Sequence, residues 1–249
     1  MKKVLLVTGA SRGIGAATAL LAAHRGWDVA VNYSTHAQAA QDVVVQAIAA
    51  AGGRAISVQA DVANEGQVLA MFETVREKLG PVSGLVNNAG VLDVAARLDE
   101  MSVARWRRMF EINVIGSLLC AREAVRQMST RHGGSGGSIV NLSSAAARMG
   151  APGQYLDYAA SKGAIDTFTI GLAKEVAAEG IRVNAIRPGL IDTEIHASGG
   201  SPNRVRELEH LVPIQRGGTA LEVAQAVLWL LSDEASYTTM SLLDVSGGR

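Results

Sequence analysis

The chain contains few of the residues that mark several common classes of protein. Of its 249 residues, 1 is cysteine, 5 are proline and only 4% are aromatic. The single cysteine, Cys120, excludes an internal disulfide framework and fits a reducing compartment, and we expect it to be a packed core thiol. Apolar residues make up 48% of the chain, so it can bury a sizeable core that is built mainly from aliphatic side chains.

Net charge and long apolar runs are also absent from the sequence. Lysine plus arginine and aspartate plus glutamate both total 23, so nothing in the charge favours nucleic acid or an anionic membrane as a partner. No segment reaches the ~20 apolar residues of a membrane span. The apolar start at residues 4–7 is broken by Thr8 and Gly9, unlike a signal peptide. We therefore expect a cytoplasmic protein.

Short β-type segments alternate with longer helical patterns along the whole chain. The short segments are continuously apolar, which is typical of strands buried on both faces of a parallel sheet. The expected strands are residues 4–8, 29–32, 55–60, 85–88, 139–143, 181–186 and 242–245. The expected helices are residues 14–25, 37–51, 67–79 and 103–128, one that follows Tyr158, and a last one that opens with the capping box Thr219–Glu222.

This alternation predicts an α/β fold, a single-domain Rossmann-type doubly wound sheet of about seven parallel strands flanked by helices on both faces. No linker or change of composition divides residues 1–249. Residues 192–212 have mixed polarity and no clear period, so we expect a substrate lid there. The glycine-rich residues 131–137 precede a strand instead of opening a helix, which favours a solvent loop.

A glycine turn follows the first expected strand and leads directly into a helix. Glycines let a backbone approach a pyrophosphate closely, and a helix N-terminus offers free N–H groups and the positive end of its dipole. This strand–turn–helix context favours a dinucleotide site over a generic loop. The turn reads Thr8-Gly9-Ala10-Ser11-Arg12-Gly13-Ile14-Gly15.

The second expected strand indicates which nicotinamide cofactor binds. An NAD site usually carries an acidic residue at the end of this strand, but here it ends Asn32-Tyr33-Ser34, and Asp28 lies at the opposite end. Arg12 can form charge-assisted bonds to a 2′-phosphate. Both features favour NADP(H). NAD(H) remains the alternative cofactor. Arg12 could instead be an ordinary solvent-exposed charge on a loop, with no role in cofactor binding.

Tyr158 and Lys162 have the spacing of an acid–base pair. Residues four apart in a helix lie on one face. At about 4 Å and an effective dielectric constant of about 20, the lysine cation stabilises a phenolate by roughly 4 kcal/mol, which lowers the tyrosine pKa by roughly 3. A tyrosine that titrates near neutrality is a useful acid–base catalyst. The spacing alone is common, and an ordinary surface helix is the alternative.

These motifs together, in this order, resemble the short-chain dehydrogenase/reductase family nearly from end to end. The family's markers are Thr8-Gly9-(x)3-Gly13-Ile14-Gly15, Asp61-Val62, Asn87-Asn88-Ala89-Gly90, Asn113, Ser144, Tyr158-x-x-x-Lys162, and Pro188-Gly189 followed by Thr193. The chain looks most like the 3-oxoacyl-carrier-protein reductase and sugar dehydrogenase branches.

The resemblance implies an NADP(H)-dependent oxidoreductase that transfers a hydride between the nicotinamide and a carbonyl or secondary alcohol. The substrate would be a 3-oxoacyl thioester, a ketone or a sugar. The alternatives are an NAD-preferring dehydrogenase of the same family and a non-catalytic nucleotide-sensing scaffold on the same fold. Family members are commonly homotetramers, with contacts that would map here to about residues 103–128, 158–178 and 242–248.

The resemblance also implies a role for each site residue. Tyr158 would be the general acid in carbonyl reduction, Lys162 would lower its pKa and bind the nicotinamide ribose, and Ser144 would donate a hydrogen bond to the substrate oxygen. Asn113 would kink its helix and hold a water that links Lys162 to solvent. No metal is expected. Cofactor contacts would come from Gly9, Ser11, Arg12, Gly13, Ile14, Gly15, Asn32, Tyr33, Ser34, Asp61, Val62, Asn88, Ala89, Gly90, Tyr158, Lys162, Pro188, Gly189, Ile191 and Thr193.

For two of these roles, the donor to the substrate oxygen and the acid–base tyrosine, a nearby residue of the same type is the alternative. Ser143 and Ser144 point to opposite faces of a strand. The family usually places its serine thirteen residues before the tyrosine, where this chain has Ala145, so Ser144 is preferred and Ser143 is the alternative. Tyr155 has Ala159 four residues later, and we expect it in the pocket wall.

The substrate pocket and its surroundings can also be predicted in part. Arg204 and Arg206 could attract an anionic carrier, but Glu207 and Glu209 beside them favour a solvated helix face. The expected pocket residues are Val91, Leu92, Ala145, Met149, Gln154, Tyr155, Leu190 and Ile195.

Overall fold

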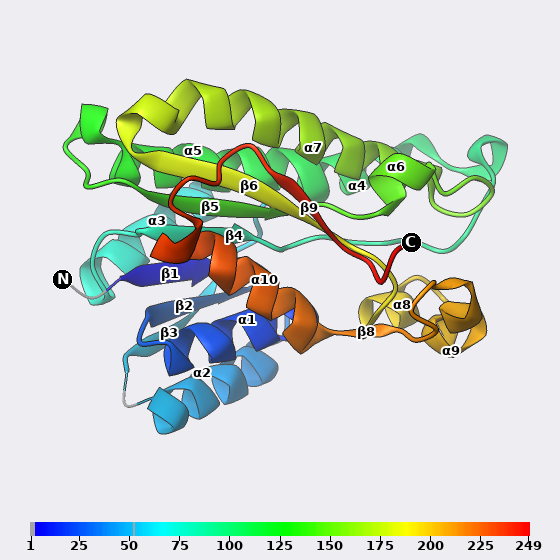
Figure 1. The fold of residues 1–249 in the computed structure, drawn as a ribbon, viewed down its shortest axis with the longest axis horizontal. Helices are drawn as coiled ribbons and strands as arrows, with labels where there is room; N and C mark the ends of the chain where they lie inside the picture. Colours follow the sequence, from blue (N-terminus) through cyan, green and yellow to red (C-terminus); the bar gives the residue numbers. More distant parts are fainter. Residues whose placement is uncertain (1–2, 52) are drawn as a thin grey trace.

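A seven-stranded parallel sheet forms the centre of the computed structural model, which describes residues 3–51 and 53–249 (Figure 1). Its strands are β1 (Val4–Val7), β2 (Asp28–Tyr33), β3 (Ala55–Gln59), β4 (Gly84–Asn87), β5 (Gly137–Leu142), β6 (Ile181–Pro188) and β9 (Leu242–Val245). They lie in the order β3-β2-β1-β4-β5-β6-β9, and each neighbouring pair is parallel. The predicted α/β fold is confirmed, and the ends of the predicted strands differ by at most two residues.

The strand order reverses at β1, which pairs with β2 on one side and β4 on the other. From β1 the chain builds outward to β3, and it then returns to build β4 and the remaining strands on the opposite side. In such sheets ligands bind at the carboxyl ends of the strands where the order reverses. The glycine turn after β1 and residues 88–90 after β4 both lie there, so the topology brings two predicted cofactor motifs together.

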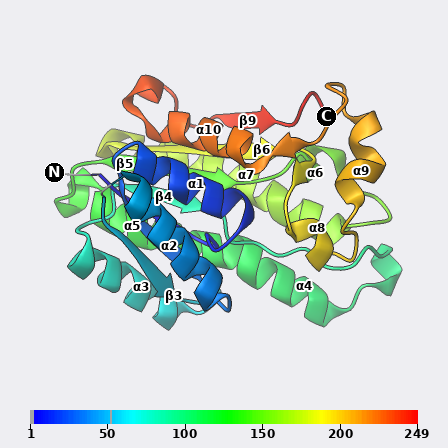
Figure 2. The ribbon, with the colours of Figure 1, turned by 90° about the horizontal axis from the view of Figure 1, so that it is seen from below.

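Helices cover both faces of the sheet (Figures 1 and 2). One layer contains α1 (Gly13–His24), α2 (Ala37–Ala51) and α10 (Ala220–Leu231). The other layer contains α3 (Glu65–Lys78), α4 (Val103–Phe110), α5 (Gly116–Met128) and α7 (Leu156–Val176). The predicted capping box at Thr219 and Glu222 opens α10. α3 begins two residues earlier than predicted, because the Asn64 side chain accepts a hydrogen bond from the Gln67 N–H and caps the helix.

The central strands bury side chains on both faces. Leu5 and Val7 pack toward α1 and α10, whereas Val4 and Leu6 pack on the opposite side, in the cluster that contains Cys120. Successive side chains in a strand point to opposite faces, so burial of both faces produces the continuous apolar runs of the sequence. Burial also raises the pKa of the Cys120 thiol to about 12, which confirms a packed core thiol.

The predicted helix over residues 103–128 contains a π-helical segment. α4 ends at Phe110, a π-helix spans Glu111–Ile115, and α5 begins at Gly116. Single π-helical turns within α-helices frequently occur at functional sites, because they locally change the register of the helix. Here the irregular turn contains Asn113, a residue that the sequence motifs single out.

Between β6 and α10 the chain leaves the sheet and forms small elements at its carboxyl edge (Figures 1 and 2). These are β7 (Ile191–Asp192), α8 (Ile195–Ser198), α9 (Arg204–Leu208) and β8 (Gly218–Thr219), with a short helix, α6 (Ala146–Met149), after β5. β7 and β8 pair in parallel as a separate two-stranded sheet. This region includes the predicted lid over residues 192–212, whose function as a lid stays a prediction. Single 3-10 turns occur at Leu98–Glu100, Thr130–His132, Ala177–Glu179, Glu209–Leu211 and Asp233–Ala235.

Among the described residues, no helix combines the length and apolar character that a membrane crossing requires.

Candidate active site

Two adjoining cavities lie at the carboxyl edge of the sheet. The larger, of about 580 Å³, is lined by the glycine turn and by the ends of β2, β3 and β4. The smaller, of about 380 Å³, extends from the shared wall toward α6, α7 and α9. The predicted cofactor residues in the larger cavity are Gly9, Ser11, Arg12, Gly13, Ile14, Asn32, Tyr33, Ser34, Asp61, Val62, Asn88, Ala89, Gly90 and Thr193. Those in the smaller cavity include Tyr158, Lys162, Pro188, Gly189 and Ile191.

The glycine turn has the form of a phosphate cradle. Gly9 has a φ of +60°, and a Cβ at this position would lie 2.8 Å from the Ala89 Cα, so only glycine fits between the two loops. α1 starts without a side-chain cap on its first N–H groups and without an acidic residue in its first turn. A helix N-terminus with these properties suits an anion, so the residues present fit the pyrophosphate of a dinucleotide.

Gly15 and Asn32 support the glycine turn, the first through close packing and the second through hydrogen bonds. Gly15 lines neither cavity, and a Cβ there would approach the Asn88 Nδ2 to 2.5 Å, so its small size serves packing, and its direct contact with the cofactor stays a prediction. Asn32 is buried: its Oδ1 accepts a hydrogen bond from the Gly9 N–H at 3.1 Å, and its Nδ2 donates to the Ala60 carbonyl at 3.0 Å. Asn32 therefore fixes the turn against the ends of β2 and β3.

Asn88 joins the loop after β4 to the glycine turn. Its Nδ2 donates to the carbonyl oxygens of Thr8 at 2.8 Å and Gly9 at 3.0 Å. The Thr8 hydroxyl in turn accepts from the backbone N–H groups of Asn88 and Ala89, both at 3.0 Å. These bonds span about 80 residues of sequence and hold together the two sides of the larger cavity.

The charged side chains around β2 lie where the sequence predicts them, with an arginine at the larger cavity and the aspartate at the far end of the strand. Arg12 is exposed at the larger cavity, and its Nη2 lies 3.4 Å from the Ser198 Oγ of α8. Asp28, at the far end of β2, forms an ion pair with Arg54 at 2.7 Å. The cavity wall formed by the end of β2 thus carries Tyr33 and Ser34 but no carboxylate. Arg108, which the sequence motifs did not indicate, also lines this cavity.

Tyr158 and Lys162 face the smaller cavity from the first two turns of α7. The Lys162 Nζ lies 5.6 Å from the centroid of the Tyr158 ring and donates a hydrogen bond to the Leu142 carbonyl at 2.6 Å. Burial lowers the pKa of Lys162 to about 8, while the charge of Asp166 raises it slightly. Lys162 is therefore mostly protonated at pH 7.

The pKa of Tyr158 moves in the direction opposite to that expected from the sequence. Burial raises it, and a hydrogen bond with the Ser144 side chain lowers it by less. The expected dominance of Lys162 is wrong, because removing a phenolate from water costs more free energy than its neighbours return. Tyr158 therefore holds its proton at neutral pH, which is the form that can donate to a substrate oxygen.

The structure distinguishes the two adjacent serines. Ser143 is buried, and its hydroxyl donates to the Lys162 carbonyl at 3.2 Å. Ser144 is partly exposed at the smaller cavity, accepts from the Ala146 N–H at 3.1 Å, and lies near enough to Tyr158 to lower the pKa of that residue. The preferred serine is therefore the one with a hydroxyl beside Tyr158.

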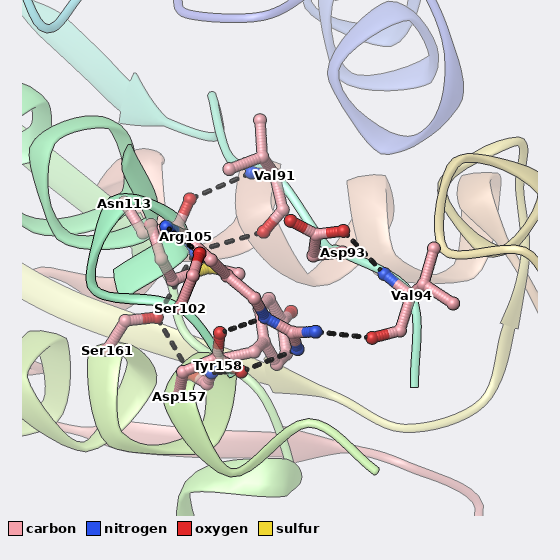
Figure 3. Close-up of polar contacts among 10 residues, drawn as sticks. Val91, Asp93, Val94, Ser102, Arg105, Asn113, Asp157, Tyr158 and Ser161 are labelled. Carbon is pink, nitrogen blue, oxygen red and sulfur yellow. Dashed lines mark hydrogen bonds and ion pairs between the residues drawn. The ribbon is translucent and has the colours of Figure 1, made fainter. Parts of the chain in front are cut away.

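Asn113 is completely buried in the π-helix and links three segments (Figure 3). Its Oδ1 accepts from the Val91 N–H at 2.8 Å, and its Nδ2 donates to the Val91 carbonyl and the Ser161 Oγ, both at 3.1 Å. Asn113 lines neither cavity and so acts here as a brace between the π-helix, the loop after β4 and α7. Its implied role in holding a water stays a prediction.

An ion pair that the sequence did not reveal anchors the start of α7 (Figure 3). The Arg105 guanidinium of α4 binds both carboxylate oxygens of Asp157, at 2.7 and 3.1 Å, and donates to the Val94 carbonyl at 2.6 Å. The Asp157 Oδ1 also accepts from the Tyr158 N–H at 2.9 Å. The side chains of Arg105 and Asp157 are only 10% and 2% exposed. This pair therefore positions the residue before Tyr158 and ties it to α4.

The far wall of the smaller cavity is mostly as predicted, with two corrections. Leu92, Ala145, Met149, Gln154, Tyr155, Leu190 and Ile195 line it, but Val91 lines the larger cavity instead. Arg204 does not lie on a solvated helix face: it lines the smaller cavity, because α9 turns this side chain toward the loop before α7.

Comparisons with known proteins agree with this geometry. A family model described as enoyl-(acyl carrier protein) reductase matches residues 9–249. The chain is 55% identical over 246 residues to the uncharacterized oxidoreductase YgfF of Escherichia coli, with 99% of both chains covered. It is 42% identical over 250 residues to cis-4-hydroxycyclohexanecarboxylate dehydrogenase of Sinomonas cyclohexanicum, with 99% of this chain and 96% of the relative covered.

A solved structure extends the likeness to the fold. The blue fluorescent protein from a metagenomic library, crystallised in complex with NADPH, is 35% identical and superposes with a TM-score of 0.90 over 99% of this chain and 97% of that one. Sequence and fold thus agree over nearly the whole length. The chain belongs to the short-chain dehydrogenase/reductase family and is an NAD(P)-dependent oxidoreductase that acts on CH–OH groups.

Proposed function

We propose that the chain is an NADP(H)-dependent oxidoreductase that interconverts a ketone and a secondary alcohol. The observation that carries this proposal is that Tyr158 and Ser144 both line the smaller cavity, with Ser144 near enough to influence the pKa of Tyr158, beside the cavity that fits a dinucleotide. Two hydroxyl groups that line the same part of a cavity are suited to bind one carbonyl oxygen. We call the larger cavity the cofactor cavity and the smaller the substrate cavity.

In the proposed reaction, the residues of this chain manage the proton and the developing charge. A bound nicotinamide dinucleotide supplies the hydride that reduces the carbonyl carbon. Tyr158 gives its hydroxyl proton to the carbonyl oxygen, and Ser144 donates a hydrogen bond to the same oxygen as negative charge grows there. The C=O bond becomes a C–OH bond. The raised pKa of Tyr158 supports this direction, because it keeps the proton in place until the substrate oxygen can accept it.

Lys162 acts after the proton has left Tyr158. Its cation, 5.6 Å from the ring centroid, stabilises the phenolate that remains. Its pKa of about 8 leaves it charged at neutral pH. The cofactor-binding roles assigned to Lys162, Asp61, Val62, Pro188, Gly189, Ile191 and Thr193 belong to the same proposal.

The lining of the substrate cavity favours a ketone over a sugar. Its wall is formed largely by apolar side chains, including Leu92, Met149, Leu190 and Ile195, which offer no partners for several hydroxyl groups. The similarity to a dehydrogenase named for a hydroxylated cyclohexane ring supports a secondary alcohol of this kind.

A spectrophotometric screen tests the proposed function. Ketones, 3-oxoacyl thioesters, enoyl thioesters, quinones and sugars are assayed with NADPH and NADH, and ketone reduction with NADPH is the expected result. Tight NADPH binding without turnover of any compound would support the alternative of a nucleotide-sensing scaffold.

Arg12 is proposed to select NADP(H) over NAD(H). Arg12→Ala is expected to weaken NADPH binding about 10-fold and to leave NADH binding nearly unchanged, because only NADPH carries a 2′-phosphate. Fluorescence titration with each cofactor measures both dissociation constants. Arg25→Ala, an exposed arginine at the other end of α1, is the matched control. Equal losses for the two cofactors would refute the role.

Ser144 is proposed to bind the substrate oxygen. Ser144→Ala is expected to lower kcat about 10²- to 10³-fold, as for the loss of one donor to a developing oxyanion. Ser143→Ala removes only the bond to the Lys162 carbonyl, so it is expected to cost about 1 kcal/mol of stability and little activity. Steady-state kinetics and thermal unfolding of both variants separate the effects. The reverse ranking of activities would assign the role to Ser143.

We also propose that the chain forms a homotetramer, as members of this family commonly do. Large apolar side chains are exposed on the first segment assigned to the contacts, residues 103–128: Val103, Phe110 and Ile115. Such exposed apolar surface supports contact with another copy of the chain.

A further inference from the structure

We propose that Arg204 binds a carboxylate group of the substrate, so that the substrate is a ketone or secondary alcohol that also carries a carboxylate. This inference rests on the proposed function, because it concerns the same cavity. It narrows the substrate class, since neither a sugar nor the reacting end of a 3-oxoacyl thioester carries such a charge.

Arg204 is held at the cavity by neutral partners. Its Nη2 donates to the Gln154 Oε1 at 2.7 Å, and its Cζ lies 5.0 Å from the centroid of the Tyr155 ring. An amide and an aromatic ring fix the orientation of a guanidinium without cancelling its charge. Tyr155 is itself only 4% exposed, so it gives Arg204 a rigid support.

Two other arginines that bind residues of α7 have carboxylate partners. Arg105 binds Asp157 at 2.7 Å, and Arg187 binds Asp166 at 2.8 Å. The Arg204 guanidinium forms no ion pair with any described residue, and Gln154 is its one hydrogen-bond partner among them. The guanidinium has five N–H donors, so most of them are available to a ligand.

The charged side chains that line the substrate cavity are all cationic. Its lining includes Lys162, Arg204 and Arg249, and none of its described lining residues is an aspartate or glutamate. Much of the remaining wall is apolar. A cation in such surroundings is poorly compensated, so an anionic ligand gains more free energy here than it would at an exposed arginine.

His196 lies beside Arg204 but adds no positive charge. Its Nε2 lies 2.9 Å from the Ile191 carbonyl oxygen, which can only accept a hydrogen bond, so Nε2 carries the proton. Burial lowers the pKa of His196, and the charge of Arg204 lowers it too, while the hydrogen bond to Ile191 and the charge of Asp192 offset only part of this change. The imidazole is therefore neutral at pH 7, and Arg204 supplies the charge at this end of the cavity.

The geometry favours a carboxylate over a phosphate. A single guanidinium matches the two oxygens of a carboxylate, whereas a phosphate dianion usually needs more than one cation or a helix N-terminus. Lys162, at the catalytic end, is engaged with the Leu142 carbonyl and lies beside Tyr158. The cavity volume of about 380 Å³ suits a small molecule with its carbonyl at Ser144 and Tyr158 and its carboxylate at Arg204.

A binding experiment tests this assignment without requiring turnover. Cyclohexanecarboxylate and cyclohexanecarboxamide, which match in shape and differ in charge, are titrated calorimetrically into protein saturated with NADP⁺. The wild type is expected to bind the carboxylate about 10- to 100-fold more tightly, the range for a hydrogen-bonded charge pair. Arg204→Met is expected to remove this preference, and Arg204→Lys to retain part of it because the charge stays while the fork is lost.

Arg206→Met is the matched control, because Arg206 lies on the same short helix but is exposed and outside the cavity lining. It is expected to keep the wild-type preference. Equal binding of acid and amide by the wild type, or an equal loss for both ligands in Arg204→Met, would overturn the proposal and leave Arg204 as a structural contact.

Kinetics then separate this inference from the proposed function. With 4-oxocyclohexanecarboxylate and its amide as substrates, Arg204→Met is expected to raise KM for the acid about 10- to 100-fold and to leave the amide nearly unchanged. Turnover of neutral ketones without a preference for the acid would refute only the carboxylate site. A preference in binding without turnover of either ketone would refute only the proposed reaction.

Discussion

Tyr158→Phe is expected to lower kcat by about 10²- to 10⁴-fold, the usual contribution of a positioned general acid. The variant keeps the ring and loses only the hydroxyl, so the packing around α7 stays intact. The dissociation constant for NADPH is expected to change little, because the proposed phosphate cradle lies in the glycine turn. Single-turnover kinetics at saturating cofactor measure the chemical step directly.

Tyr237→Phe is the matched control for this substitution, because its side chain is fully exposed and distant in sequence from the site. It is expected to behave as the wild type. If Tyr158→Phe retained more than about a tenth of the wild-type kcat, the proton would come from another group, and Tyr155, which lines the same cavity, would be the next candidate.

Lys162→Met is expected to damage chemistry and cofactor binding together. At 5.6 Å and an effective dielectric constant of about 20, loss of the cation removes roughly 3 kcal/mol of phenolate stabilisation, or about 100-fold in rate. The proposed contact with the nicotinamide ribose disappears as well, so NADPH binding is expected to weaken. Lys174→Met, an exposed lysine farther along α7, is the control.

The pH profile gives this prediction a second readout. Burial lowers the pKa of Lys162 to about 8, so the cation is present below pH 8 and is lost as the pH rises above it. The value of kcat/KM for reduction is therefore expected to fall above about pH 8 in the wild type. In Lys162→Met this alkaline limb should be absent. A limb that persists unchanged, with NADPH affinity also unchanged, would remove Lys162 from the mechanism.

The features that follow local patterns could be predicted from the sequence. Each strand of the parallel sheet is a buried apolar run, and the glycine turn lies between such a run and a helix, so strands and turn were found within two residues. Tyr158 and Lys162 share a helix face because four residues separate them. These features depend on neighbours in the chain, which the sequence displays directly.

The features that were missed depend on contacts between distant segments. Arg105 and Asp157 lie 52 residues apart, and nothing near either one indicates the pair. Arg204 was expected on a solvated face because Glu207 and Glu209 follow it, yet its direction is set by contacts with Gln154 and Tyr155. The direction of the Tyr158 pKa was wrong for the same reason, since burial is a property of the folded chain.

The π-helix at Glu111–Ile115 makes the length of this stretch as important as its composition. Each residue of an α-helix turns the next by about 100°, so an irregular turn changes the angle between the faces of α4 and α5. α4 directs Arg105 to the start of α7, while α5 packs against β4 and α3. Losing one residue here would restore a regular helix and rotate Arg105 away from Asp157. The position of Arg105 at the start of α7 therefore depends on the number of residues in this stretch as well as on their identity.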